Sequence, residues 1–374
     1  MAESVSWLKA MDPRETKLNI LLLALPITLY FNYVDQDHSL AFFSSLIAIM
    51  PLAFLMGRAT EEIALRTTES LGGLLNATFG NAAELIIAVL LILEASRVAD
   101  PETQSFFIHL VQASLIGSIL GNLLLVMGLA FVWGGIHHSE QKYSETQVSS
   151  NGSLLLLSMI VLVIPTVFHS SVGGEGGDSR LLDLSHIAAA ILLLVYGLFL
   201  LFQFRTHVHL FATDGSHHEE PEMTQRDSII LLVVATVLVS WMAEILVHSV
   251  EYAAEDFGLP HLFIGVILLP LFGNAAEHFT AVTVAGKDKM DLSFAISMGS
   301  STQIAVFIAP LMVIIAWALG VPLTFEFGIL ETVSAFLAVL IVNSIAADGK
   351  SNWLEGAMLL SSYGVLAAAF LFHP

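Results

Sequence analysis

The five residues Gly-Asn-Ala-Ala-Glu occur twice in the sequence, at 80–84 and at 273–277, each time inside an otherwise apolar run. Each copy ends in a carboxylate, Glu84 or Glu277. A carboxylate placed in hydrocarbon costs about a few kcal/mol, and such residues usually mark ion or proton pathways. A structural hydrogen bond between helices is the alternative role, but the repeated context disfavours it. Glu84 and Glu277 are therefore the centre of a candidate site.

Each motif places an amide near its carboxylate. Residues three apart share a face of a helix, so we expect Asn81 beside Glu84 and Asn274 beside Glu277. Carboxylate and amide oxygens are hard ligands, which suit calcium because this ion takes about six to eight oxygens. The motif residues thus predict a calcium site. Metal binding needs deprotonated carboxylates, so calcium and protons would compete for it.

Glycines and small polar residues surround the proposed site. Gly80 and Gly273 precede the asparagines and allow either close helix approach or a local break that frees backbone carbonyls. Later apolar runs contain a second matched pair, Gly117-Ser118 and Gly299-Ser300. Further oxygen donors on these runs are Ser118, Asn122, Ser300, Ser301 and Gln303. Polar contacts between helices are an equally open role for these side chains.

Two more features concern helix packing. Gly117 and Gly121 form a small-xxx-small pattern, which predicts that their helix lies close to a neighbour. Pro270 lies three residues before the second motif and predicts a kink there, whereas Ala77 holds this place in the first half. The two halves are therefore expected to differ in detail.

The composition is that of an integral membrane protein. Of 374 residues, 56% are hydrophobic and 12% are charged, against about 25% charged in soluble domains, and the mean hydropathy is +0.81. The net charge of -20 gathers in connections, so nucleic-acid binding is disfavoured. The absence of cysteine excludes disulfides and thiolate metal sites. Residues 1–17 lack a cleavage-type pattern, so no removable signal peptide is expected.

The chain is predicted to be an all-α polytopic protein, because a bilayer span needs about 20 apolar residues and runs of that length form helices. Hydropathy indicates eleven spans, at about 18–34, 39–57, 72–94, 106–133, 152–169, 181–204, 228–250, 259–285, 291–319, 324–346 and 353–372. With the N-terminus inside, eleven of the thirteen Lys and Arg residues fall on the cytoplasmic side. Because cytoplasmic loops are enriched in these residues, we expect a cytoplasmic N-terminus and a C-terminus on the opposite side.

The spans divide into two halves around an acidic connection. Residues 1–37 hold the N-terminus and an extra first span, 38–205 hold spans two to six, 206–227 form an acidic cytoplasmic linker, and 228–374 hold spans seven to eleven. Five spans in each half mean that the second motif enters the membrane from the opposite side, so the halves form an inverted repeat. The linker is interpreted as a solvated tether, with a calcium sensor as the alternative.

Other acidic residues extend the symmetry only in part. Glu62 lies 22 residues before Glu84, and Glu255 lies 22 residues before Glu277. These two are either pathway residues or solvated helix ends, and Arg58 or Arg66 could pair with Glu62. Glu244 and Glu331 also lie in apolar runs, but they have no matched partner.

The chain resembles the calcium/proton exchanger family of the calcium/cation antiporter superfamily, from about the second span to the C-terminus. The resemblance rests on both five-residue motifs, on Met-Gly-Ser-Ser-Thr-Gln-Ile at 298–304 and on Asp-Gly-Lys-Ser-Asn-Trp-Leu-Glu-Gly at 348–356. It implies a two-repeat antiporter whose motif glutamates bind calcium and protons, with Glu62 and Glu255 as candidate relays. It also implies a possible homotrimer, a location in a cell membrane or an organelle membrane such as the vacuole, and no resident cofactor.

Several alternatives remain at the level of the sequence. A sodium-coupled or broader cation exchanger belongs to the same class, but sodium/calcium exchangers usually carry proline where Ala83 and Ala276 stand here. A passive channel is a further possibility that fits opposed repeats less well. Two facing carboxylates could also act as acid and base in an intramembrane hydrolase. No His-Glu-x-x-His zinc motif supports that reading, so the chain is predicted not to be an enzyme.

Overall fold

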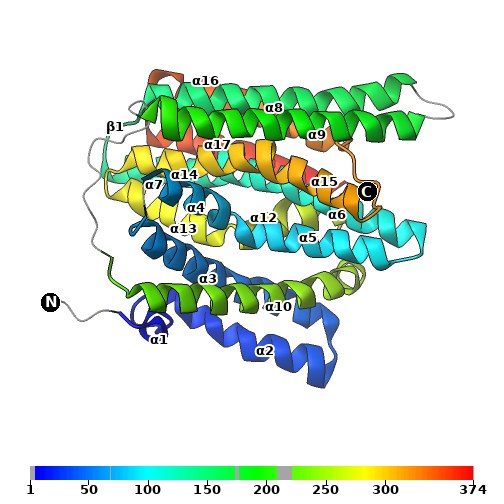
Figure 1. Cartoon of the computed structure of the whole chain (residues 1–374), viewed down its shortest axis with the longest axis horizontal. Coiled ribbons are helices and arrows are strands. Elements are labelled where there is room, and N and C mark those ends of the chain that lie inside the picture. The colour runs from blue at the N-terminus through cyan, green and yellow to red at the C-terminus, as the bar shows by residue number, and fades with distance from the viewer. Residues whose placement is uncertain (1–4, 68, 173–176, 209–220, 374) are drawn as a thin grey trace. The chain divides into compact units, whose positions relative to one another are not determined.

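The computed structural model describes residues 5–67, 69–172, 177–208 and 221–373. Nearly all of this is helical (Figure 1). In the described residues, nine helices are long and apolar enough to cross a membrane, and one bent pair, His261–Gly273 with Ala275–Gly286, passes the same test when both parts are taken together. The all-α polytopic prediction is confirmed. The count of eleven is not reproduced, because the predicted span at 72–94 is broken into two shorter helices at Asn81.

The helices gather into two compact units whose segments alternate along the chain. Unit 1 comprises Met1–Leu90, Ala212–Leu259 and Leu271–Glu277, and unit 2 comprises Leu91–Phe211, Pro260–Pro270 and His278–Pro374. Helices α5, α12 and α13 each have residues in both units. The residues that the sequence predicts for the site are distributed over the ranges of both units.

In unit 1, helices α3 and α10 pack along one another (Figure 1), and each of the elements α1, η1, α2, η2 and α4 contacts one of these two helices. Helix α3 includes Pro51, and α10 ends on Gly258 in the left-handed conformation, with φ of 59°. The elements of this unit and those shared with unit 2 are α1 (Trp7–Ala10), η1 (Lys17–Leu23), α2 (Ala24–Tyr30), η2 (Phe31–Asp35), α3 (His38–Ala64), α4 (Glu69–Gly80), α5 (Ala82–Arg97), α10 (Gln225–Phe257), α12 (Leu269–Gly273) and α13 (Ala275–Gly286).

Unit 2 contains two long helices that are interrupted by π-helical turns: α6 continues through η3 into α7, and α14 continues through η7 into α15. Its elements are α6 (Pro101–Leu120), η3 (Gly121–Val126), α7 (Met127–His137), β1 (Gln141–Lys142), α8 (Glu145–Val172), α9 (Gly177–Leu201), η4 (Phe202–Thr206), α11 (His261–Phe263), η6 (Ile264–Leu268), α14 (Met290–Gln303), η7 (Ile304–Ile308), α15 (Ala309–Ala318), α16 (Ile329–Ile345), η8 (Ala346–Asp348), β2 (Lys350–Ser351) and α17 (Trp353–Leu371).

The small sheet of unit 2 ties two connections together. Strands β1 and β2 pair antiparallel, with Gln141 opposite Ser351. The hydroxyl of Tyr143 donates to the Lys350 carbonyl at 2.7 Å, and burial raises the pKa of this phenol. Since a raised pKa keeps the phenol protonated, Tyr143 retains the proton that it donates in this bond.

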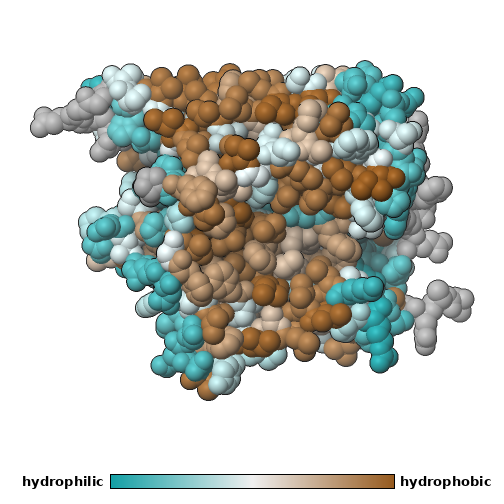
Figure 2. All heavy atoms as spheres, turned by 180° about the vertical axis from the view of Figure 1, so that it is seen from behind, coloured by the Kyte–Doolittle hydropathy of each residue, from teal (hydrophilic) through white to brown (hydrophobic). Residues whose placement is uncertain are grey.

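The surface has the apolar character that a bilayer requires. On α9, the residues Ile187, Ile191, Leu194 and Leu198 are all more than half exposed and follow the three- and four-residue spacing of one helix face. Figure 2 shows one face on which hydrophobic residues cover the middle and hydrophilic residues gather toward the edges. A soluble protein would rarely expose so large an apolar area, so these helices are suited to contact lipid.

Candidate cation site

The helix is interrupted at the asparagine of each motif. Helix α4 ends at Gly80 and α5 begins at Ala82, while α12 ends at Gly273 and α13 begins at Ala275. The second pair is bent by 59°. Of the two alternatives that the preceding glycines left open, close helix approach or a local break, the local break is present in both motifs. The break does not depend on proline, because the first motif has none.

Each break places its glutamate in the first turn of a new helix. Glu84 lies in the first turn of α5 and Glu277 in that of α13. The carbonyl of Asn81 accepts the first helical bond of α5, from the Leu85 amide at 3.1 Å. Unpaired amides give a helix N-terminus a partial positive charge that stabilises a nearby carboxylate. The fold thus offsets part of the cost of holding the two acids in an apolar region.

The two motifs face one another within unit 1. A Cβ atom built on Gly80 would lie 3.1 Å from Oε1 of Glu277, and one built on Gly273 would lie 3.8 Å from Cγ of Glu84. Each glutamate therefore reaches the glycine of the other motif. Both asparagines are only 1% exposed, and both glutamates are half-buried. The structure brings together six predicted residues: Gly80, Asn81, Glu84, Gly273, Asn274 and Glu277.

The other predicted oxygen donors lie in unit 2. Ser118 and Asn122 are buried at the junction of α6 and η3, while Ser300, Ser301 and half-buried Gln303 end α14 just before η7. Neither amide atom of Asn122 has a hydrogen-bond partner among the described residues. The Ser301 hydroxyl donates to the Ser297 carbonyl at 2.9 Å. A π-helical turn follows the Gly-Ser pair in both halves, and such turns are frequent at functional sites.

Glycine lets α6 approach the segment before the second motif. A Cβ on Gly117 would collide with the Val266 carbonyl and would lie 2.6 Å from Cγ of Pro270. A Cβ on Gly265 would collide with that of Ala113. The close packing predicted for Gly117 is confirmed. It is wrong for Gly121, where a Cβ would meet nothing within 4 Å.

The two outer acids differ sharply. Glu62, near the end of α3, is 6% exposed. Its carboxylate accepts the amides of Glu222 and Met223 at 3.0 and 3.1 Å and lies 3.3 Å from the Arg66 guanidinium. Glu255, in the last turns of α10, is exposed. The solvated-end interpretation is therefore wrong for Glu62, while exposure agrees with it for Glu255.

The sequence could not reveal the two backbone amides that bind the Glu62 carboxylate, because Glu222 and Met223 lie 160 and 161 residues away. Arg66 is the nearby partner, whereas Arg58 pairs with Glu222 at 3.2 Å. The linker residues 209–220 lie outside the described residues, so the tether and the calcium sensor both stay predictions for that stretch.

The donor set limits which metal this site could hold. Across the described ranges, no group of three or more His, Cys, Asp or Glu side chains converges. A calcium ion at the motifs would therefore be held by two carboxylates and completed by amide, hydroxyl, carbonyl or water oxygens, which calcium accepts. A soft or tetrahedral metal site would need imidazole or thiolate ligands that the motifs do not provide.

Sites formed at the breaks of discontinuous helices are typical of secondary transporters. The chain matches the family model described as sodium/calcium exchanger protein over residues 38–205 and 227–372, and it belongs to that family.

Several relatives and solved structures are similar over almost the whole chain. The chain is 44% identical to the Ca(2+)/H(+) antiporter of Aphanothece halophytica, over 95% of this chain and 96% of the relative. It is 39% identical to the vacuolar calcium ion transporter of Schizosaccharomyces pombe, over 95% and 85%. The solved structure of native YfkE matches with a TM-score of 0.81 at 35% identity, over 95% of this chain and 99% of that one.

Proposed function

We propose that this protein is a transporter that exchanges calcium for protons across a membrane by alternating access. The main structural support for this proposal is that Glu84 and Glu277 lie at two facing helix breaks, each against the glycine of the other motif. One site with two carboxylates can take calcium or protons but cannot be filled by both together. Relatives named as Ca(2+)/H(+) antiporters support calcium and protons as the substrates.

Competition at one site is the minimum that antiport needs. The empty site carries two negative charges, which resist passage through a low-dielectric region, whereas bound calcium or bound protons neutralise them. Rocking of the two repeats, 38–205 and 228–374, around the site would expose it to each side in turn. The extra helix within 1–37 and the linker at 206–227 complete this proposed organisation. Lys and Arg placement supports a cytoplasmic N-terminus.

A sodium-coupled exchanger is the second candidate, since the family model covers sodium/calcium exchangers. Ala83 and Ala276 favour protons over sodium as the counter-ion, because sodium/calcium exchangers usually carry proline at these two positions. A homotrimer remains a prediction from the resemblance.

The test uses purified protein in proteoliposomes with an acidic interior and a pH-sensitive dye. Calcium added outside should dissipate the proton gradient, and sodium or potassium should not. Liposomes without protein and the exposed-site variant Glu102→Gln are the controls. Proton flux driven by sodium and not by calcium would favour the second candidate. The absence of any calcium-dependent flux would contradict the proposal.

A further inference from the structure

Unit 2 contains a cavity of about 730 Å³ that the exchange site does not account for. It lies among α6, α9, α11 and the connection from α15 to α16. Its volume falls within the range of about 300–1,000 Å³ that is typical of small-molecule sites. All of its lining residues belong to unit 2, at helix ends that the charge distribution predicts to face away from the cytoplasm.

One wall of the cavity is an extended segment, residues 321–328. Every second side chain is buried, with Val321, Leu323, Phe325 and Phe327 at most 3% exposed. The alternate residues Pro322, Thr324, Glu326 and Gly328 line the cavity, and of the buried set only Phe327 also reaches it. This alternation is that of an extended chain, in which successive side chains point to opposite faces. The wall therefore presents Glu326 to the cavity.

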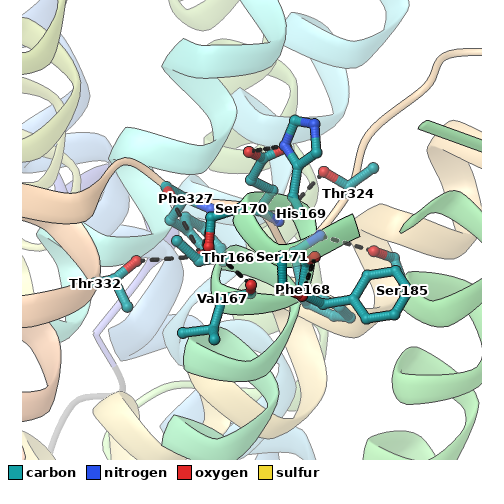
Figure 3. Close-up of polar contacts among 12 residues, drawn as sticks. Thr166, Val167, Phe168, His169, Ser170, Ser171, Ser185, Thr324, Phe327 and Thr332 are labelled. Atoms are coloured by element: carbon teal, nitrogen blue, oxygen red, sulfur yellow. Dashed lines mark hydrogen bonds and ion pairs between the residues drawn. The ribbon is translucent and has the colours of Figure 1, made fainter. Parts of the chain in front are cut away.

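Three neighbouring helices hold this wall by its backbone. The Gln112 amide donates to the carbonyls of Thr324 and Glu326 at 3.0 and 2.8 Å. The amide of Phe325 donates to the Ser185 hydroxyl at 3.1 Å, and that of Phe327 donates to the Thr166 hydroxyl at 3.3 Å (Figure 3).

The imidazole of His169 also contacts the Glu326 carboxylate. Figure 3 shows His169 and Thr166 on α8 beside the segment. A wall fixed at this many points is organised before any ligand binds, which lowers the entropic cost of binding.

A second acid follows the wall at the start of α16. Glu331 is 5% exposed, and its Oε2 accepts the Gly328 amide at 2.7 Å. Its Oε1 is buried and receives no hydrogen bond from any residue in the described part of the chain. A buried acceptor without a donor is energetically costly, and more so when it is charged. Since Glu331 also lines the cavity, a donor entering there would meet this need.

The lining favours a cation with an apolar body. Glu326 and Glu331 are the acidic residues, and none of the described lining residues is Lys or Arg. Three histidines, at 109, 261 and 373, also line the cavity, and His373 lies near enough to Glu331 to interact with its carboxylate. A histidine accepts a hydrogen bond from the ligand only when it is neutral. Much of the remaining wall is apolar, for example Ile108, Leu181 and Leu262. A metal ion is not favoured here, because in the described ranges no three acidic or imidazole side chains converge on a point.

We propose that this cavity, between the segment 321–328 and α6, binds a small organic cation, with its ammonium group at Glu331 and Glu326 and its apolar body against α6 and α11. The inference does not rest on calcium/proton exchange, because neither motif glutamate lines the cavity. A free amine and the ethanolamine headgroup of a phospholipid share this chemistry.

The test measures binding of phenethylamine to the purified full-length protein in delipidated detergent, by titration calorimetry. We expect saturable binding, with 2-phenylethanol, which is similar in shape but neutral, failing to bind. Glu331→Gln should weaken phenethylamine binding at least tenfold. Glu102→Gln on exposed α6 surface outside the cavity should leave it unchanged.

A second variant keeps the test informative if Glu331→Gln does not fold. Ser105→Trp places a large side chain at the cavity wall without changing any charge, and it should abolish binding. Equal binding by wild type, Glu331→Gln and Ser105→Trp would overturn the proposal. Binding of calcium or manganese alone, lost in Glu331→Gln while the amine never binds, would overturn it in favour of a metal site.

Nanodiscs distinguish the two sources of the cation. If lipid supplies it, discs that contain phosphatidylethanolamine should weaken phenethylamine binding relative to discs of phosphatidylglycerol alone. Equal binding in both discs would assign the site to soluble amines.

Discussion

The first and second halves of the chain are alike at their motifs and unlike around them. Both helices break at the asparagine and place a glutamate in the next first turn. Yet Gly117 is pressed against backbone while its counterpart Gly299 has open space, and Glu62 is buried while Glu255 is exposed. The repeated sequence thus gives both halves the same side chains at the candidate cation site, whereas the packing around each motif differs between the halves.

The largest difference in stability between matched variants of the two halves is expected at Gly117 and Gly299. Gly117→Ala places a Cβ against the Val266 carbonyl, so helix α6 must move. We expect destabilisation of about 3 kcal/mol, the upper end for overpacking. Gly299→Ala should change stability by less than about 1 kcal/mol, because a Cβ there meets nothing within 4 Å. Thermal unfolding in detergent checks both, and equal unfolding temperatures for the two variants would break the comparison.

A smaller difference is expected at the outer acids. Glu62→Gln removes the charge that accepts two backbone amides and pairs with Arg66, so we expect a loss of about 1–3 kcal/mol in unfolding free energy. Glu255→Gln, at an exposed position, should stay within about 0.5 kcal/mol of the wild type. Chemical denaturation measures both. A stable Glu62→Gln protein with impaired transport would instead favour a role as a relay.

The smallest difference is expected at the motif glycines. Gly80→Ala brings a Cβ to 3.1 Å from Glu277 Oε1, whereas Gly273→Ala leaves 3.8 Å to Glu84 Cγ. The carboxylate can shift slightly, so we expect Gly80→Ala to raise the half-saturating calcium concentration about fivefold, equivalent to about 1 kcal/mol. Gly273→Ala should stay near the wild type. The same effect from both would mean that the two glycines face equivalent acids.

The sequence predicted the candidate site best where reactive residue types recur at the same spacing. The repeated motifs identify Glu84 and Glu277, and the preceding glycines allow the breaks that the structure contains. It offered Arg66 as a partner of Glu62, but it could not supply the amides of Glu222 and Met223, because contacts between residues about 160 apart leave no local pattern. It also misplaced the tenth span, predicted from 324, whereas α16 begins at Ile329. The alternation of large apolar residues with Pro322, Thr324, Glu326 and Gly328 was the available signal, since a period of two indicates extended chain.

The central claim is that calcium and protons compete for Glu84 and Glu277. The most direct test is the calcium dissociation constant of the purified protein as a function of pH. Each proton displaced by calcium should tighten binding about tenfold per pH unit wherever the site is protonated. Glu84→Gln and Glu277→Gln should each weaken calcium binding strongly and flatten this dependence, and Glu102→Gln should do neither. Calcium affinity that is independent of pH in the wild type, or unchanged in both glutamine variants, would contradict the account.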